Sequence, residues 1–139
     1  KEHLNENGVM VVNMNMRGNN EGNINQYLSD TIASVFDHIV TVDVDGSTNR
    51  ELYASSNADM VKTLENNANE TGHSDLRDMM LHVADTSSVY EAGDYIMTDD
   101  KAPVELLGMQ VIDQLIQGEV AYYKDIFEKD GINGLLESL

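Results

Sequence analysis

Residues 8–16, with the sequence GVMVVNMNM, form a nearly continuous apolar run close to the start of the printed chain. Such a run is typical of a strand that is buried on both faces in a parallel sheet. A buried parallel strand needs neighbouring strands, and the rest of the sequence does not contain an obvious set of them. We therefore expect this run to begin the C-terminal half of a larger fold that is truncated at its N-terminus.

The stretch around this strand predicts one further helix and two further strands. Residues 23–36 carry apolar side chains at spacings of three and four, the pattern of one helical face. Residues 38–44 and 50–56 have strand-like sequences, and the turn formers at residues 45–49 join them as an antiparallel hairpin. Residues 1–7 resemble the frayed end of a helix. The expected order is strand, helix, strand, strand, in the α/β class.

The second half of the chain is expected to be helical. Apolar spacing and capping residues predict helices over residues 58–69 and 74–83. Pro103 fits the first position of the longest helix, which is expected to end near residue 130, at an Asp-Gly pair.

Charge limits the partners that the chain can have. Acidic residues outnumber basic ones by 25 to 8, which gives a formal net charge of −17. This surface repels a phosphate backbone and anionic lipid, so we expect no nucleic acid and no membrane contact by this segment. It would attract a cationic small molecule. The alternative interpretation is that the acidic surface only keeps the protein soluble. The chain has no cysteine, which excludes a thiolate metal site and a cysteine nucleophile.

Three segments together carry a resemblance to a known family. They are GVMVVN at residues 8–13, LYASS at residues 52–56 and TDDKAPVE at residues 98–105. In this order they resemble the C-terminal half of a spermidine synthase-like protein, within the S-adenosylmethionine-dependent methyltransferase superfamily. The similarity covers most of residues 1–105, and the order of the three segments, with TDDKAPVE last, is typical of the branch that is often fused to membrane segments.

The resemblance implies the C-terminal half of a Rossmann-like methyltransferase sheet, with residues 8–16 as the fifth strand and the hairpin strands as the last pair, followed by several helices. Residues 1–56 would form this half-sheet, and residues 57–139 a helical part that packs on it, together one domain. In this family the Gly-rich loop, the acid that holds the ribose and the catalytic aspartates precede such a segment. The resemblance therefore implies no catalytic residue here, and a cytoplasmic chain that is inactive alone.

The resemblance also implies S-adenosylmethionine or decarboxylated S-adenosylmethionine as the cofactor of the parent protein, a polyamine aminopropyltransferase or methyltransferase. This chain has no G-x-G-x-x-G motif, and its nearest glycines, Gly18 and Gly22, follow a strand with the wrong spacing. We therefore expect the chain itself to bind no cofactor. A cationic polyamine substrate in the parent would suit the acidic surface. The alternative function is a non-catalytic interaction or assembly module that retains half of the parental Rossmann-like fold.

Five polar residues are candidates for substrate binding. Asn13, Asn15 and Arg17 follow the first strand at the end where open α/β sheets bind ligands, and alternation places them on one face. They could equally mark the place where a buried strand leaves the core. Asp99 and Asp100 could hold an ammonium group as paired carboxylates, or cap the helix that follows them.

No metal site is expected. Asp43, Asp45 and Gly46 have part of the spacing of a calcium loop, but Thr41 and Leu52 stand where that loop needs acidic ligands. This segment is therefore interpreted as a turn. The four histidines lie on separate predicted elements without paired ligand spacing.

The first strand also predicts self-association. Without a strand beside it, one edge of residues 8–16 would expose unpaired backbone groups next to apolar side chains. Such an edge tends to recruit another strand. We expect a homo-oligomer that forms through this edge or through its flanking helices.

Overall fold

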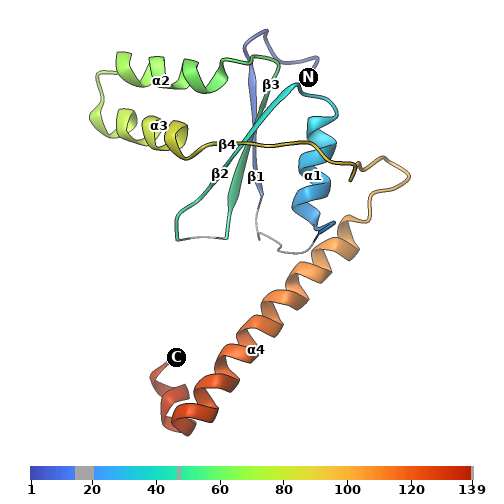
Figure 1. Ribbon diagram of the computed structural model, residues 1–139, viewed down its shortest axis with the longest axis vertical. Coiled ribbons are helices and arrows are strands. Elements are labelled where there is room, and N and C mark those ends of the chain that lie inside the picture. Colours follow the sequence, from blue (N-terminus) through green and yellow to red (C-terminus); the bar gives the residue numbers. More distant parts are fainter. Residues whose placement is uncertain (15–20, 47, 139) are drawn as a thin grey trace. The chain divides into compact units, whose positions relative to one another are not determined.

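The structure is a computed structural model that describes residues 1–14, 21–46 and 48–138. The chain divides into two compact units, Lys1–Ala102 and Pro103–Leu139, and each is described by itself. The first unit holds a small sheet with helices, and the second is a long helical segment that is interrupted near its end (Figure 1).

The sheet contains β1 (Val9–Met14), β2 (His38–Asp43), β3 (Arg50–Ser55) and the very short β4 (Ser88–Val89), in the order β1-β3-β2-β4. β3 pairs antiparallel with β1 on one side and with β2 on the other, so β1 and β2 run in the same direction. The helix α1 (Ile24–Ala33) connects these two strands. The expected α/β class and strand–helix–strand–strand order are confirmed, and the arrangement is consistent with a Rossmann-like C-terminal half.

β1 is an edge strand, which differs from the doubly buried parallel strand that its apolar run predicts. Among the described residues its one strand neighbour is β3, which runs antiparallel to it. Met14 is 2% exposed on the α1 side, whereas Val9 and Val11 on the other face are 40% and 53% exposed. The prediction of burial on both faces is therefore wrong. Valine and methionine are apolar whichever face they occupy. The sequence pattern therefore cannot distinguish a strand that is buried on one face from a strand that is buried on both.

The core lies between α1 and one face of the sheet. Leu52 and Ala54 of the central strand β3 are completely buried, because strands flank them on both sides. Burial of a leucine side chain contributes roughly 1.5–3 kcal/mol. The other members of the core are Met14, Phe36 and Ile39, with Leu28, Ile32 and Ala33 of the α1 region packed against them.

Local residues set the start of α1 and the turn of the hairpin. The Oδ1 of Asn23 accepts a hydrogen bond from the N–H of Gln26 at 3.1 Å and so caps α1. Between β2 and β3 the chain turns at Gly46, whose φ of 67° favours glycine. The N–H of Val44 donates to the carbonyl of Asn49 at 3.1 Å and closes the turn that the sequence predicts.

The helices α2 (Met60–Glu70) and α3 (Ser74–Thr86) lie side by side next to the other face of the sheet (Figure 1). α2 begins slightly later than expected, because the Oδ1 of Asn57 accepts the N–H of Asp59 at 2.9 Å and holds a turn before the helix. α3 continues past its expected end to Thr86. The expectation that residues 57–139 form one helical part that packs on the sheet stays a prediction.

After α3 the chain forms β4 and then an irregular segment beside α1. The pairs Val40–Val89 and Thr41–Ser88 join β4 to β2, and the N–H of Tyr90 donates to a carbonyl of β2 at 3.0 Å. This strand was not expected from the sequence, because two residues show no periodicity.

Residues 1–7 form turns, and the expected frayed helix end stays a prediction. The N–H of Gly8 donates to the carbonyl of Asn5 at 2.8 Å, which makes a local turn before β1. The Nζ of Lys1 lies 3.2 Å from the carboxylate of Asp37, just after α1. This ion pair helps to hold the first residues near the sheet, although its exposure makes its contribution small.

The second unit consists of α4 (Val104–Glu137), which begins directly after Pro103 as expected. Gly131 has φ 64° and ψ −156°, a conformation that interrupts the helix at the place where the sequence predicts its end. Helical residues then continue to Glu137. Within the described ranges, no helix combines the length and the apolar character that crossing a bilayer requires.

Replacing the central leucine tests this assignment of the core. Leu52→Ala should lower the free energy of unfolding by about 3 kcal/mol, because it removes buried contacts and leaves a cavity. Leu76→Ala is the matched control, since Leu76 on α3 is 41% exposed, and it should cost less than about 1 kcal/mol. Urea unfolding followed by circular dichroism measures both values. Equal losses would contradict the core described above.

Candidate functional site

The carboxyl ends of β1 and β2 and the N-terminus of α1 lie at the same end of the sheet (Figure 1). Open α/β sheets bind ligands at this end. Asn13 is the next-to-last residue of β1 and is exposed on the face opposite α1. Asn15 and Arg17, the two other residues predicted here, lie outside the described residues.

Charged residues of β2 and β3 lie at this end of the sheet, on both of its faces. Glu51 lies directly opposite Asn13 on the neighbouring strand. On the other face, the guanidinium of Arg50 forms a two-point bond with Asp43, with Nε–Oδ1 at 2.6 Å and Nη2–Oδ2 at 3.2 Å. This hydrogen bonding to Asp43 raises the pKa of Arg50. The positive charge of Arg50 is therefore already engaged, and the charge closest to Asn13 in the pairing is the Glu51 carboxylate.

Asp99 and Asp100 lie in a tight turn between Thr98 and Lys101. The N–H of Lys101 donates to the carbonyl of Thr98 at 2.8 Å, and the N–H of Thr98 donates back at 3.3 Å. Both carboxylates are exposed. At the N-terminus of α4 no side chain makes a capping hydrogen bond, so the capping interpretation of this pair has no bond to support it. In the described part of the chain, no hydrogen bond or ion pair joins either aspartate to Asn13.

A buried carboxylate that was not predicted from the sequence holds the segment after β4 beside α1. Asp30 of α1 is 1% exposed, and its Oδ1 accepts hydrogen bonds from the Tyr90 hydroxyl at 2.7 Å and the Gly93 N–H at 2.9 Å. Its Oδ2 accepts the N–H of Tyr95 at 2.9 Å. These three donors compensate the loss of water around the carboxylate. We call Asp30 with Tyr90, Gly93 and Tyr95 the Asp30 clamp.

The Asp30 clamp places Tyr95 against the first turn of α1. The ring centroids of Tyr95 and Tyr27 lie 5.1 Å apart, and the Tyr95 hydroxyl donates to Oε1 of Glu21 at 3.1 Å. One helical turn further, Oγ1 of Thr31 accepts the N–H of Met97 at 2.8 Å. The backbone between the clamp and Met97 is thereby held along α1, and the tyrosine lies at the end of α1 that is nearest in sequence to the end of β1.

Glu21, Tyr27 and Tyr95 form what we call the aromatic–acidic group. Aromatic faces and a carboxylate are the partners that organic ammonium groups bind. The hydrogen bond to Glu21 raises the pKa of Tyr95, so its hydroxyl stays protonated and donates at neutral pH. Among the residues that the structure describes, no group of three or more His, Asp or Glu side chains is placed to hold a metal ion.

The sequence carries weak signals for the Asp30 clamp. Ser29, Asp30 and Thr31 put three consecutive polar residues into a helix whose apolar pattern already has a buried side. Ser29 is 2% exposed, and its hydroxyl donates to the Met14 sulfur at 3.6 Å. Gly93 is the second signal, because a Cβ there would lie 2.8 Å from the Asp30 carboxylate. Only glycine fits at this position without a shift of the carboxylate.

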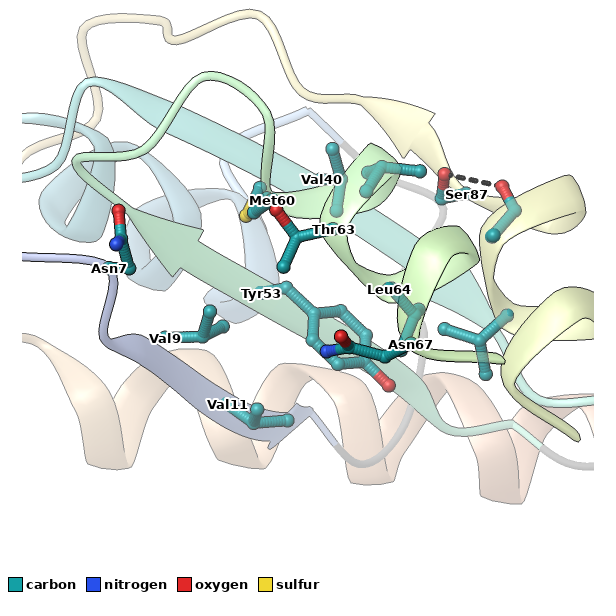
Figure 2. Close-up of a pocket in the computed structure, with 13 residues that line it drawn as sticks. Asn7, Val9, Val11, Val40, Tyr53, Met60, Thr63, Leu64, Asn67 and Ser87 are labelled. Atoms are coloured by element: carbon teal, nitrogen blue, oxygen red, sulfur yellow. Dashed lines mark hydrogen bonds between the residues drawn. The ribbon is translucent and has the colours of Figure 1, made fainter. Parts of the chain in front are cut away.

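A cavity of about 330 Å³ lies between the other face of the sheet and the helices α2 and α3 (Figure 2). The ring of Tyr53 projects into it from β3, and its pKa is raised by burial and, to a lesser extent, by Glu51. Valine, leucine and methionine side chains supply most of the lining, and no charged residue contributes. This cavity does not suit an ammonium group, and none of the predicted site residues line it.

Removing the Asp30 carboxylate should loosen the segment that it holds. Asp30→Ala should lower the free energy of unfolding by about 3 kcal/mol, because three donors lose their acceptor. Asp30→Asn should cost less, since its amide oxygen can still accept. Asp94→Ala is the control, because Asp94 lies in the same segment with an exposed side chain. Urea unfolding gives the energies, and amide exchange at Gly93 and Tyr95 should accelerate in Asp30→Ala. Unchanged exchange would contradict the clamp.

The hydroxyl of Tyr90 should lose its proton at a higher pH than an unfolded tyrosine does. Burial, together with the hydrogen bond to Asp30, raises the pKa of Tyr90 to about 12, whereas an unfolded tyrosine titrates near pH 10. The folded state therefore keeps this proton longer. Its contribution to stability is complete below about pH 10 and is lost between about pH 10 and 12. In a pH titration followed by phenolate absorbance, the step at the highest pH should disappear in Tyr90→Phe and remain in Tyr122→Phe. Loss of the same step in both variants would be inconsistent with this environment.

The whole chain aligns at 44% identity over 156 positions with the probable polyamine aminopropyl transferase of Bifidobacterium longum (strain NCC 2705). The alignment covers 100% of this chain and 35% of that relative, so the chain spans about a third of the length of the curated protein that it matches. No protein-family model matches the chain, and no solved structure matches it. Along its whole length the chain is therefore similar to a polyamine aminopropyl transferase, which confirms the spermidine synthase-like resemblance of the sequence.

Proposed function

We propose that this chain is part of a polyamine aminopropyl transferase-like domain and that it contributes to the binding of the amine. The observation that carries this proposal is the 44% identity along the whole chain to a probable polyamine aminopropyl transferase. Because the chain spans about a third of that relative, we propose the transferase activity for a longer protein that contains such a segment. The chain alone is proposed to be inactive.

The aromatic–acidic group supports a role toward an amine. Glu21 supplies a carboxylate, and the rings of Tyr27 and Tyr95 lie beside each other at the end where open α/β sheets generally bind ligands. A net charge of −17 draws polycations toward the whole surface, and a local carboxylate with aromatic faces would give one of their ammonium groups a defined position. Asn13 and Glu51 extend this polar end on the sheet itself.

No recognised nucleoside-binding motif lies in this chain. The chain has no G-x-G-x-x-G motif, and the N–H of Gly22, at the entrance to α1, already donates to Oε1 of Gln26 at 2.7 Å. We therefore propose S-adenosylmethionine or decarboxylated S-adenosylmethionine only for the longer protein, and we assign no step with it to this chain.

The residues of this chain can hold and orient an amine. A carboxylate close to an ammonium group stabilises its protonated form, which suits an end of a polyamine that does not react. Fixing that end limits the positions of the reacting nitrogen, and positioning of this kind lowers the barrier to a transfer between two bound molecules. The Asp30 clamp would act through Tyr95, by keeping its ring and hydroxyl in place.

Calorimetry with the 139-residue chain tests this role. Spermidine should bind weakly, and methylthioadenosine should give no heat, because we propose the nucleoside site for the longer protein only. Glu21→Gln should weaken spermidine binding about fivefold, since it removes a charge-assisted contact. Glu91→Gln is the matched control, because it removes an exposed carboxylate from the segment that carries the clamp.

The two glutamate variants separate a defined site from diffuse attraction. If Glu21→Gln and Glu91→Gln weaken spermidine binding equally, the polyamine is held only by the general charge of the surface, which contradicts the proposal. If no amine binds at all, the non-catalytic interaction or assembly module is the better description of the chain.

A further inference from the structure

The cavity beside α2 and α3 has two well-defined walls. On the sheet side, Val11, Tyr53 and Val40 lie opposite one another on three neighbouring strands, so their side chains share one face. On the helix side, α2 contributes Met60 and Leu64 (Figure 2). Tyr53 and Val40 belong to strands that have a neighbour on each side, so this part of the wall does not depend on what lies beside β1.

The buried part of the lining is apolar. Val40 of β2, Met60 of α2 and Ala84 of α3 each line the cavity and are at most 9% exposed. Among the residues that the structure describes, none with a charge lines the cavity, although 24% of the chain consists of Asp, Glu, Lys and Arg. An ionised group inside it would lose water without gaining a partner of opposite charge. The cavity therefore selects against charged molecules.

Two polar side chains of the lining can still form a hydrogen bond with a ligand. The hydroxyls of Thr63 and Ser87 are engaged, because they donate to nearby backbone carbonyls at 2.9 and 2.8 Å. Within the described ranges, no hydrogen bond joins the Tyr53 hydroxyl or the Asn67 side chain to another residue. Asn67 is exposed and keeps its contact with water, whereas Tyr53 is half-buried. Tyr53 therefore gains more from a partner inside the cavity.

The volume of the cavity, about 330 Å³, sets the size of a ligand. An apolar cavity of roughly 150 Å³ holds a benzene molecule, so this one has room for a molecule of about two fused rings. Two groups of the lining favour an aromatic partner. The ring of Tyr53 can meet another ring by its face or its edge, and the polarizable sulfur of Met60 makes favourable contacts with aromatic rings.

We propose that this cavity binds an uncharged aromatic molecule, about the size of two fused rings, that carries a hydroxyl group. The rings lie between the sheet and α2, and the hydroxyl of the ligand forms a hydrogen bond with the hydroxyl of Tyr53. The site lies on the face of the sheet opposite α1. It therefore shares no residue with the aromatic–acidic group, and it does not rest on the proposed function.

The fluorescence of naphthol tests the class of ligand. The 139-residue chain has no tryptophan, so the probe can be excited without exciting the protein. Naphthol should bind about tenfold more tightly than naphthoate or naphthylmethylammonium, which carry a charge on the same rings. Tightest binding of the ammonium compound would indicate attraction to the acidic surface. That result, or no binding of naphthol, would overturn the proposal.

A pair of variants tests where naphthol binds. Val83 of α3 lines the cavity, so Val83→Phe should fill part of it and weaken naphthol binding about tenfold. Val35→Phe is the matched control, because Val35 is 49% exposed and lies outside the lining. Circular dichroism checks that both variants fold. Equal affinities of the two folded variants would place the probe elsewhere and contradict the proposal.

The hydrogen bond is tested by a variant that changes the packing very little. Tyr53→Phe removes the hydroxyl and keeps the ring, so it should weaken naphthol binding about fivefold. Naphthalene, which has the same rings without a hydroxyl, should bind the variant and the unchanged chain equally. An unchanged affinity for naphthol, or an equal loss for naphthalene, would overturn the proposal even if Val83→Phe does not fold.

Discussion

The position of the chain after α3 depends on the buried carboxylate of Asp30. A carboxylate can only accept hydrogen bonds, and the N–H groups of its own helix are already used, so donors must come from elsewhere. They come from Tyr90, Gly93 and Tyr95, which lie 60 to 65 positions further along the chain. These residues have little regular structure of their own. Without the carboxylate, their backbone groups would have to find other partners or water.

This dependence links a packing feature to the candidate site. Tyr95 is held by its backbone at Asp30, which leaves its ring and hydroxyl to meet Tyr27 and Glu21. A side chain on an irregular segment is thus positioned by a helix, and sites that are supported in this way keep their geometry better than sites on free loops. The polyamine-binding role that we propose for this end rests on that support, together with the similarity to a probable polyamine aminopropyl transferase.

Periodicity was sufficient to predict β1, β2, β3 and the three helices of the first unit, but it missed the two-residue strand β4 and could not reveal the surroundings of each element. The apolar run of β1 would have the same composition whether one face or both were buried. Its position next to β3 became visible only from the strand pairing. Asp30 was missed because a mid-helix aspartate is usually exposed, and its donors are distant in sequence. Of the predicted site residues, Asn13 lies at the expected end of the sheet, whereas Asp99 and Asp100 lie in a separate turn.

The strand order has a consequence for how the chain acquires its structure. β3 lies between β1 and β2, yet it is the last of the three to be synthesised. β1 therefore leaves the ribosome long before β3, and the hydrogen bond from Ser55 back to Gly8 closes a loop of 47 positions. Non-local pairing of this kind is slow to form, and during the delay the side of β1 that will pair with β3 can pair wrongly with other nascent chains. The time needed to make residues 15–50 sets the length of that vulnerable interval.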